Sequence, residues 1–68
     1  MWQPKYKVGD RIVANTGRTE ADNHGWFVAR VIDSICEYEL QHETGPGICF
    51  VRDEHIRGLA NQEGVDRE

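Results

Sequence analysis

The amino-acid sequence predicts an all-β fold, and three observations support this prediction. Its apolar residues come in short runs rich in β-branched side chains, the segment 37–43 alternates between polar and apolar residues, and Gly, Pro, Asn and Asp separate the runs. Short or alternating runs are typical of strands, and the separating residue types favour turns. Because the chain has 68 residues, it has room for about one small domain.

The first strand is expected over residues 11–15, directly after a Gly-Asp corner. Its sequence, Arg-Ile-Val-Ala-Asn, is apolar in the middle, too short for a helix and rich in β-branched residues. The ten residues 16–25 that follow are polar or small, which is the composition of loops. We therefore predict a long, exposed hairpin loop between the first two strands.

The strongest strand pattern covers residues 26–33. Strict alternation places Phe27, Ala29 and Val31 on one face of this strand and Trp26, Val28, Arg30 and Ile32 on the other. Neither face is purely polar, so the strand is expected to be central in the sheet. The next strand is predicted over 37–43, where alternation turns Tyr38, Leu40 and His42 inward.

The segment Thr44-Gly45-Pro46-Gly47 predicts a turn, because Pro fixes φ and Gly accepts positive φ. If Glu43 pairs with Ile48 across this turn, Leu40 opposes Val51 inside and Glu39 opposes Arg52 outside. This register leaves Ile48 and Phe50 facing outward. It is the register that the sequence predicts for the hairpin.

A single 3₁₀ turn is predicted over 53–55, followed by a last short strand over 56–59. The chain then divides into an N-terminal arm over 1–6, a folded domain over 7–60 and a flexible acidic tail over 61–68. The tail has no apolar periodicity, which is the basis for expecting it to be frayed.

The pattern resembles the five-stranded SH3-like barrel, with a long first hairpin loop and a short 3₁₀ turn before the last strand. The resemblance covers roughly residues 7–59 and depends on Val8-Gly9-Asp10-Arg11-Ile12, Trp26-Phe27-x-Ala29-x-Val31, Tyr38-x-Leu40 and Phe50-Val51-x-x-Glu54-x-Ile56. Tudor and Agenet domains, KOW-type barrels, small barrels encoded by phages and mobile elements, and a plasmid-borne trimethoprim-resistant dihydrofolate reductase share this skeleton. The fold alone does not choose among their functions.

The reductase resemblance implies a homotetrameric enzyme as one alternative. Tyr38-x-Leu40-x2-Glu43-x2-Pro46-Gly47 is similar to its third strand and turn, and Gly9-Asp10-Arg11 to its first strand. That enzyme uses a Val-Gln-Ile-Tyr segment to line its pore, and Cys49-Phe50-Val51-Arg52 stands there in this sequence. The polar Gln and Tyr are lost, so a protein that is not an enzyme is the preferred prediction.

Charge disfavours general nucleic-acid binding, because twelve acidic and eight basic residues give a formal net charge of −4. A KOW-type nucleic-acid-associated barrel stays as an alternative, with a local basic patch. Its members would be Lys5, Lys7, Arg11, Arg18 and Arg30. The sequence has no apolar run long enough to span a membrane and no signal-peptide pattern at its start, so we expect a soluble, cytoplasmic protein with no membrane partner.

No cofactor and no metal are expected. The candidate ligands Cys36-x5-His42 and Cys49-x5-His55 are spaced too widely for one tetrahedral site. The predicted register makes Cys49 and His42 neighbours, but no third group orients the histidine for catalysis. Both cysteines are therefore expected to be free thiols without a catalytic role.

A surface that binds a protein or peptide is the preferred functional prediction. Aromatic rings near strand ends attract cationic groups in Tudor-type readers, and SH3 domains resemble this chain in combining an acidic first loop with aromatic residues. The resemblance also suggests an accessory protein of a phage or mobile element. A monomer or homodimer is expected. The predicted partner-binding residues are Trp26, Ile48, Phe50, Gln41, Glu20 and Asp22.

Overall fold

The computed structural model describes residues 1–63 and shows five strands, three 3₁₀ turns and one short helix. The strands are β1 (Arg11–Ala14), β2 (Trp26–Ile32), β3 (Glu37–His42), β4 (Ile48–Val51) and β5 (Ile56–Leu59). The 3₁₀ turns are η1 (Ala21–Asn23), η2 (Asp33–Ile35) and η3 (Asp53–His55), and the helix is α1 (Ala60–Glu63). Each predicted strand is found, as is the 3₁₀ turn before the last one.

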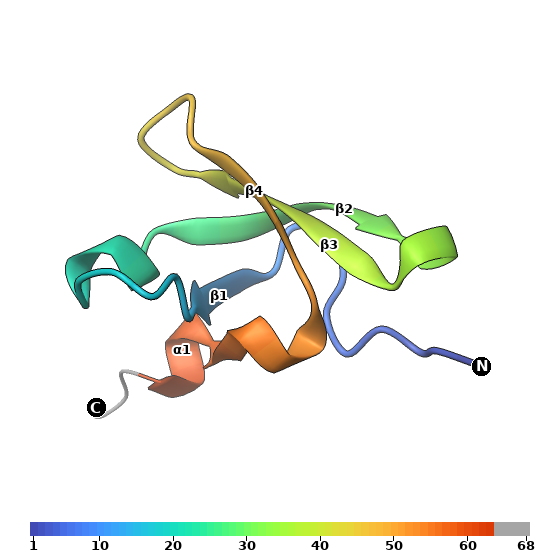
Figure 1. The fold of residues 1–68 in the computed structure, drawn as a ribbon. Coiled ribbons are helices and arrows are strands. Elements are labelled where there is room, and N and C mark those ends of the chain that lie inside the picture. The colour runs from blue at the N-terminus through green and yellow to red at the C-terminus, as the bar shows by residue number, and fades with distance from the viewer. Residues whose placement is uncertain (64–68) are drawn as a thin grey trace.

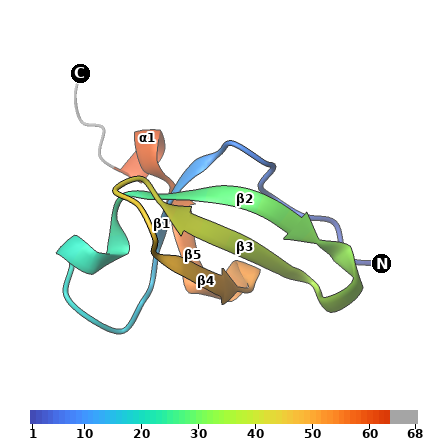
Figure 2. The ribbon, with the colours of Figure 1, turned by 90° about the horizontal axis from the view of Figure 1, so that it is seen from above.

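The five strands form one antiparallel sheet in the order β4-β3-β2-β1-β5 (Figure 1). The predicted all-β class, the long first loop and the central position of β2 are therefore confirmed. The sheet is open, since β4 and β5 are its two edges and are not paired with each other. Seen from above, the 15–25 loop, the β3–β4 turn and α1 lie at one end of the sheet, and η2 lies at the other (Figure 2).

A β-bulge at Ala29 corrects the predicted faces of β2. Val28 pairs with Leu40, but the next paired residue is Arg30, opposite Glu39, so Ala29 is the extra residue. An extra residue reverses the alternation beyond it. As a result Val31 joins Trp26 and Val28 on the core side, whereas strict alternation had placed it on the opposite face.

The β3–β4 hairpin is shifted by two residues from the predicted register. Gln41 pairs with Ile48 and Leu40 with Cys49, so a five-residue connection (43–47) joins the strands. A shift of two keeps every side chain on its predicted face, because side chains alternate with a period of two. Ile48 and Phe50 still face outward, but the predicted pairs Leu40–Val51 and Glu39–Arg52 do not form.

The core lies on the inner side of the curved sheet. Its largest fully buried side chains are Tyr38, Ile12, Leu40, Val13 and Val28. Ala14, Trp26 and Ile56 complete the buried apolar set, and half-buried side chains of β2, β4 and β5 pack against it. Burial of these apolar groups is the main force that holds so small a sheet together.

The N-terminal arm docks onto the domain and adds two aromatic rings to the core. The Trp2 and Tyr6 rings contact the Tyr38 ring edge to face, at centroid distances of 5.5 and 5.7 Å. The Trp2 indole also donates a 2.8 Å hydrogen bond to Oδ2 of Asp53 in η3. The predicted N-terminal arm, residues 1–6, therefore packs against the rest of the described chain.

The first three residues of the predicted tail, 61–63, are helical in the structure. Residues 60–63 form α1, which lies against β1 and β5. The helix is a single turn that follows β5 directly, and its sequence lacks the apolar periodicity that marks longer helices. The rest of the predicted acidic tail, residues 64–68, lies outside the described residues.

Candidate functional site

The strongest candidate site is the outer face of the sheet, which we define as Phe27, Gln41, Ile48 and Phe50. Phe27 of β2 pairs with Gln41 of β3, and Gln41 pairs with Ile48 of β4, so the three side chains stand in one row across the sheet. Phe50 lies two residues further along β4, on the same side. None of these four side chains belongs to the buried core.

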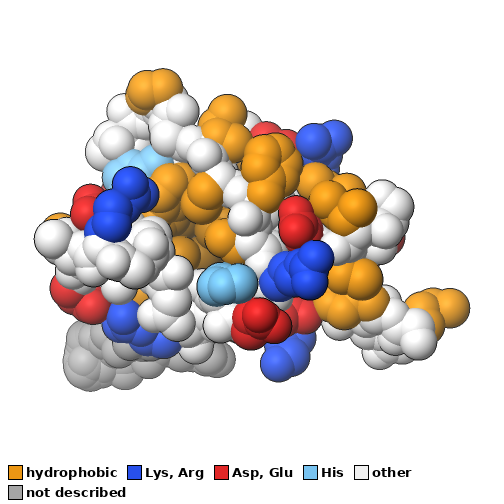
Figure 3. Space-filling view, viewed as in Figure 1, with side chains coloured by type: hydrophobic (Ala, Val, Ile, Leu, Met, Phe, Trp, Pro, Cys, Tyr) orange, Lys and Arg blue, Asp and Glu red, His pale blue; other side chains and the backbone are white. Residues whose placement is uncertain are grey.

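Ile48 and Phe50 are the exposed centre of the outer face. Their exposed fractions are 56% and 54%, although both are large apolar residues within a strand. In the space-filling view, hydrophobic side chains gather over the upper half of the molecule, where β4 crosses, and also show in a hollow at its centre left (Figure 3). Contiguous exposed apolar side chains of this kind mark sites of interaction.

Ion pairs border the outer face. Arg30 places Nη2 at 2.9 Å from Oε1 of Glu39, which lies opposite Phe50. Gln41 donates from Nε2 to the other oxygen of the same carboxylate at 3.2 Å. The Glu39 side chain is only 15% exposed, so these partners compensate a carboxylate that is largely removed from water.

Two further pairs extend this border. Nη1 of Arg11 lies 2.6 Å from Glu43, and Nε of Arg52 lies 3.4 Å from Glu37. An apolar centre with a polar rim is the general organisation of protein interfaces. The charges near the outer face are therefore arranged as neutral pairs around an apolar patch.

Trp26 does not share the outer face, in contrast to the prediction. Its exposed fraction is 7%, its indole donates a 2.8 Å hydrogen bond to the carbonyl of Asp22, and its ring contacts His42 at a centroid distance of 5.0 Å. It faces the core side because it stands on the same face of β2 as Val28. Trp26 therefore fastens the first loop to the core.

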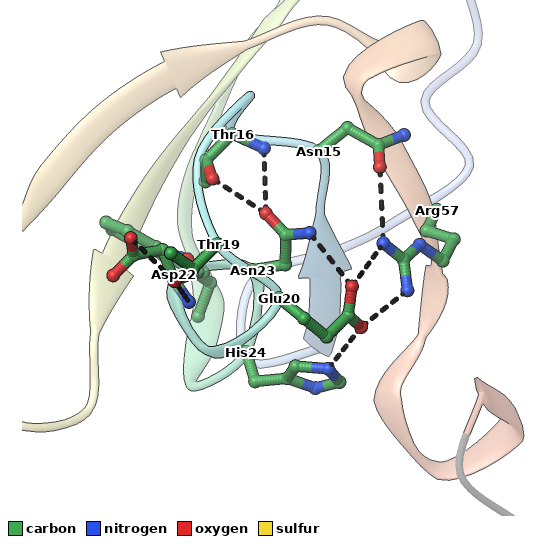
Figure 4. Close-up of polar contacts among 9 residues, drawn as sticks. Asn15, Thr16, Thr19, Glu20, Asp22, Asn23, His24 and Arg57 are labelled. Atoms are coloured by element: carbon green, nitrogen blue, oxygen red, sulfur yellow. Dashed lines mark hydrogen bonds and ion pairs between the residues drawn. The ribbon is translucent and has the colours of Figure 1, made fainter.

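The acidic residues of the first loop are engaged within the loop and with β5 (Figure 4). Glu20 accepts hydrogen bonds from both terminal nitrogens of Arg57, at 2.8 and 3.1 Å, and lies 2.9 Å from Nε2 of His24. These partners lower the pKa of Glu20 to about 2, and the hydrogen bond from Arg57 is the largest cause. Glu20 is exposed to solvent, but its charge is already compensated.

Asn23 and Asp22 stabilise the loop through hydrogen bonds to other loop residues. The buried Asn23 accepts hydrogen bonds at Oδ1 from the amide of Thr16, at 3.0 Å, and from its hydroxyl, at 2.7 Å. Asp22 accepts a 3.0 Å hydrogen bond from the hydroxyl of Thr19 and lies 3.9 Å from Arg18 (Figure 4). The predicted exposed loop is thus an internally bonded structure, and its acidic residues stabilise it.

His42 joins the first loop to the β3–β4 turn. Its Nε2 lies 2.9 Å from the carbonyl oxygen of His24, and its Nδ1 accepts a 3.2 Å hydrogen bond from the amide of Thr44. Because Nδ1 accepts and the carbonyl can only accept, Nε2 carries the proton. The imidazole therefore has a structural position at the predicted rim.

An aromatic cluster of Trp2, Tyr6 and Tyr38 was not predicted from the sequence. The signal that could have indicated it is the presence of two aromatic residues, Trp2 and Tyr6, in the short N-terminal arm. Together with Tyr38 they resemble the content of an aromatic cage, and Asp53 adds a carboxylate. The rings pack directly on one another, and Tyr38 has no exposed surface. A methylammonium ligand needs open ring faces, so this cluster is built for packing.

Apart from Lys5, the members of the predicted basic patch are paired with carboxylates. Lys7, Arg11, Arg18 and Arg30 each lie within 4.0 Å of a carboxylate, as do Arg52 and Arg57. A surface that follows a phosphate backbone needs uncompensated positive charge. Pairing of these cations weakens the case for nucleic-acid binding.

The candidate catalytic and metal residues do not come together. His42 lies opposite Gly47, to which its amide donates, whereas Cys49 lies opposite Leu40. Burial raises the pKa of Cys49, which works against a reactive thiolate. Within residues 1–63, no group of three or more His, Cys, Asp and Glu side chains is placed to hold a metal ion.

No helix within residues 1–63 is long and apolar enough to cross a membrane.

A shallow depression of about 320 Å³ lies between Gly9–Arg11 and Leu59–Asn61. Its two charged residues are already paired, since Asp10 accepts a 3.0 Å hydrogen bond from the amide of Lys7 and Arg11 contacts Glu43. The hydrogen bond from Lys7 is also the largest cause that lowers the pKa of Asp10. Because the charges of the depression are already compensated, it is a weaker candidate than the outer face.

Comparison of the sequence and structure with known protein families, curated proteins and solved structures found no match.

Proposed function

We propose that this chain is an SH3-like small β-domain that acts as a non-catalytic interaction module and binds a protein partner through the outer face. The strand order with β1 between β2 and β5, the long first loop and the 3₁₀ turn before β5 support the SH3-like assignment. The observation that carries the functional proposal is the exposure of Ile48 and Phe50 side by side on β4. Exposing two such side chains within a strand has no benefit for the folded monomer.

The polar rim supports a protein partner in particular. The pairs Arg30–Glu39, Arg11–Glu43 and Arg52–Glu37 leave the patch close to neutral, which suits an apolar protein surface better than a polyanion. Gln41 adds an amide that donates to Glu39, and no hydrogen bond to its side-chain oxygen is found among residues 1–63. In this proposal Trp26, Glu20 and Asp22 hold the scaffold, and Phe27 takes their place beside the binding residues.

The test is a capture experiment from lysate of the native cell, read by mass spectrometry. Phe50→Asp and Ile48→Asp place a charge in the centre of the patch, and Val8→Asp places the same charge on an exposed apolar residue outside the β3–β4 hairpin. We expect a protein that the unmodified chain and Val8→Asp retain and that both outer-face variants lose. A captured set that is the same for all four chains would refute the proposal.

A further inference from the structure

The free edge of β4 provides a second feature beside the outer face. The amide of His42 donates to the carbonyl of Gly47, which identifies this pair as hydrogen-bonded. Hydrogen-bonded and non-hydrogen-bonded pairs alternate along an antiparallel ladder. Cys49 therefore bonds to β3, whereas the N–H and C=O groups of Ile48 and Phe50 point away from it.

These edge groups have no partner within residues 1–63. No backbone or side-chain hydrogen bond to the main chain of Ile48 or Phe50 is found among the described residues. The residues that present unpaired backbone groups are thus the same two that expose large apolar side chains. An uncharged, unpaired edge is a template for another strand.

The two edges of the sheet differ in protection. β5 carries Arg57, whose guanidinium is held by Glu20, and it continues directly into α1. Segment 47–51 has no charged residue, and Pro46 ends the edge on one side because it has no N–H to donate. β4 is therefore the edge on which strand addition is open.

We propose that β4 pairs antiparallel with β4 of a second copy, about a two-fold axis that passes through Cys49. This inference rests on the proposed function only in using the same strand. In this register Ile48 of each copy opposes Phe50 of the other, and each such pair exchanges both backbone hydrogen bonds. The apolar side chains also meet across the axis, on the outer side of the joined sheet.

The alternative symmetric registers are poorer. Centring the axis on Phe50 places Ile48 opposite Arg52 of the second copy, and centring it on Ile48 places Phe50 opposite Pro46, which lacks the donor. Pairing through Cys49 also consumes both β4 edges and leaves only the protected β5 edges, so association closes at two copies. The two outer faces then join into one larger apolar surface for a partner.

The dimer is expected to be weak, because strands of four residues bury little area. We expect a dissociation constant of roughly 10–1,000 μM. Sedimentation equilibrium over this concentration range should show the mass rising from one chain to two and no further. Mass that stays at one chain, or species larger than two chains as from pairing of β4 with β5, would overturn the proposal.

A synthetic chain with an N-methyl group on Phe50 isolates the edge. Ligation at Cys36 gives access to it, and the modification removes an edge donor while the Phe50 side chain and the β3–β4 ladder are kept. We expect the dissociation constant to rise at least about tenfold, with an unchanged circular dichroism spectrum. Unchanged association would overturn the proposal. If the methyl group unfolds the chain, which the circular dichroism spectrum would show, the Cys49 crosslinking test described next decides instead.

Cys49 reports the register without altering the edge. Opposed residues in a non-hydrogen-bonded pair have Cα atoms about 4.5 Å apart, within the range that a disulfide spans. Diamide takes up the two protons and two electrons released by the thiols. We expect a disulfide-linked dimer from the natural chain and from Cys36→Ser, but none from Cys49→Ser. A dimer that links only through Cys36 would overturn the proposal.

The two proposals fail separately. If the N-methylated monomer still captures a protein that Phe50→Asp loses, the outer face binds its partner without the dimer. If the chain dimerises through Cys49 and captures nothing, the outer face serves self-association and the proposed function is wrong.

Discussion

The hydroxyl of Tyr38 donates a 2.6 Å hydrogen bond to Oδ1 of Asp53, across the inner side of the molecule from β3 to η3. The same hydroxyl accepts a 3.0 Å hydrogen bond from the amide of Lys5. The other oxygen of Asp53 accepts from the Trp2 indole. One phenol and one carboxylate thus fasten the N-terminal arm and the start of β5 to the same point of the sheet.

Tyr38→Phe should lower the free energy of unfolding by about 1–3 kcal/mol, because the bond to the carboxylate is charge-assisted and the Asp53 oxygen and the Lys5 amide lose a partner. Tyr6→Phe is the matched control, since its ring contacts Tyr38 and no hydrogen-bond partner of its hydroxyl is found within residues 1–63. Urea denaturation of both variants measures the difference. Equal losses would contradict the assigned role of the hydroxyl.

Alkaline titration should show tyrosine ionisation above its ordinary range. Burial, followed by the hydrogen bond to Asp53, raises the pKa of Tyr38 to about 12, and burial also raises the pKa of Tyr6. Because the folded pKa lies above the unfolded value of 10.0, the stabilisation is complete below pH 10.0 and is lost as the pH rises towards about 12. Phenolate absorbance should therefore appear at a lower pH in the urea-unfolded chain than in the folded chain. Identical ultraviolet titrations of the folded and urea-unfolded chains would contradict this expectation.

The Glu20 carboxylate should remain ionised in acid. Its pKa is lowered from 4.5 to about 2, so the stabilisation is complete above pH 4.5 and is lost as the pH falls towards about 2. Glu20→Gln should show less acid dependence of stability across this interval, and added salt should reduce the difference because the site is exposed. A carboxyl carbon titration by NMR measures the pKa directly. A midpoint near 4.5 would show that Arg57 does not hold this group.

Gly25→Ala should destabilise the chain more than Gly17→Ala. Both glycines have positive φ, +88° and +81°, so an alanine at either position carries a similar backbone cost of about 1–2 kcal/mol. A Cβ at Gly25 would also lie 2.6 Å from Nε2 of His42, whereas a Cβ at Gly17 meets nothing within 4 Å. The larger loss at Gly25 measures the cost of displacing His42 from the carbonyl of His24. Similar melting temperatures for the two variants would refute it.

Phe50→Ala should cost under about 1.5 kcal/mol of stability, because more than half of its surface is exposed. Leu40→Ala, on the opposite side of the sheet and fully buried, should cost about 2–5 kcal/mol. Denaturant unfolding of the two variants compares the faces of the hairpin. The reverse order would place Phe50 in the core and remove the basis of the outer face.

The sequence by itself determined the strands, the long first loop, the 3₁₀ turn at 53–55 and the outward direction of Ile48 and Phe50. These features depend on local composition and on alternation, and both are written in neighbouring residues. The hairpin prediction shows the limit of this logic. A register error of two residues left every face correct, because the period of a strand is two, but it misplaced the partners Glu39 and Arg52.

Only the tertiary structure decided which side chains contact one another across distant segments of the chain. The burial of Trp26 depends on the loop carbonyl of Asp22, to which its indole donates, and on its contact with the His42 ring. Glu20 is compensated by Arg57, which is 37 residues away in the sequence, and Asp53 collects Trp2 and Tyr38 from two other segments. Such partners lie far apart in the sequence and meet only when the chain folds, so no pattern of neighbouring residues predicts them. Ile48 and Phe50 lie on the outer face as predicted, because their direction depends on alternation alone. Glu20 and Asp22 are instead engaged by other residues, Glu20 by the distant Arg57 and Asp22 by the nearby Thr19.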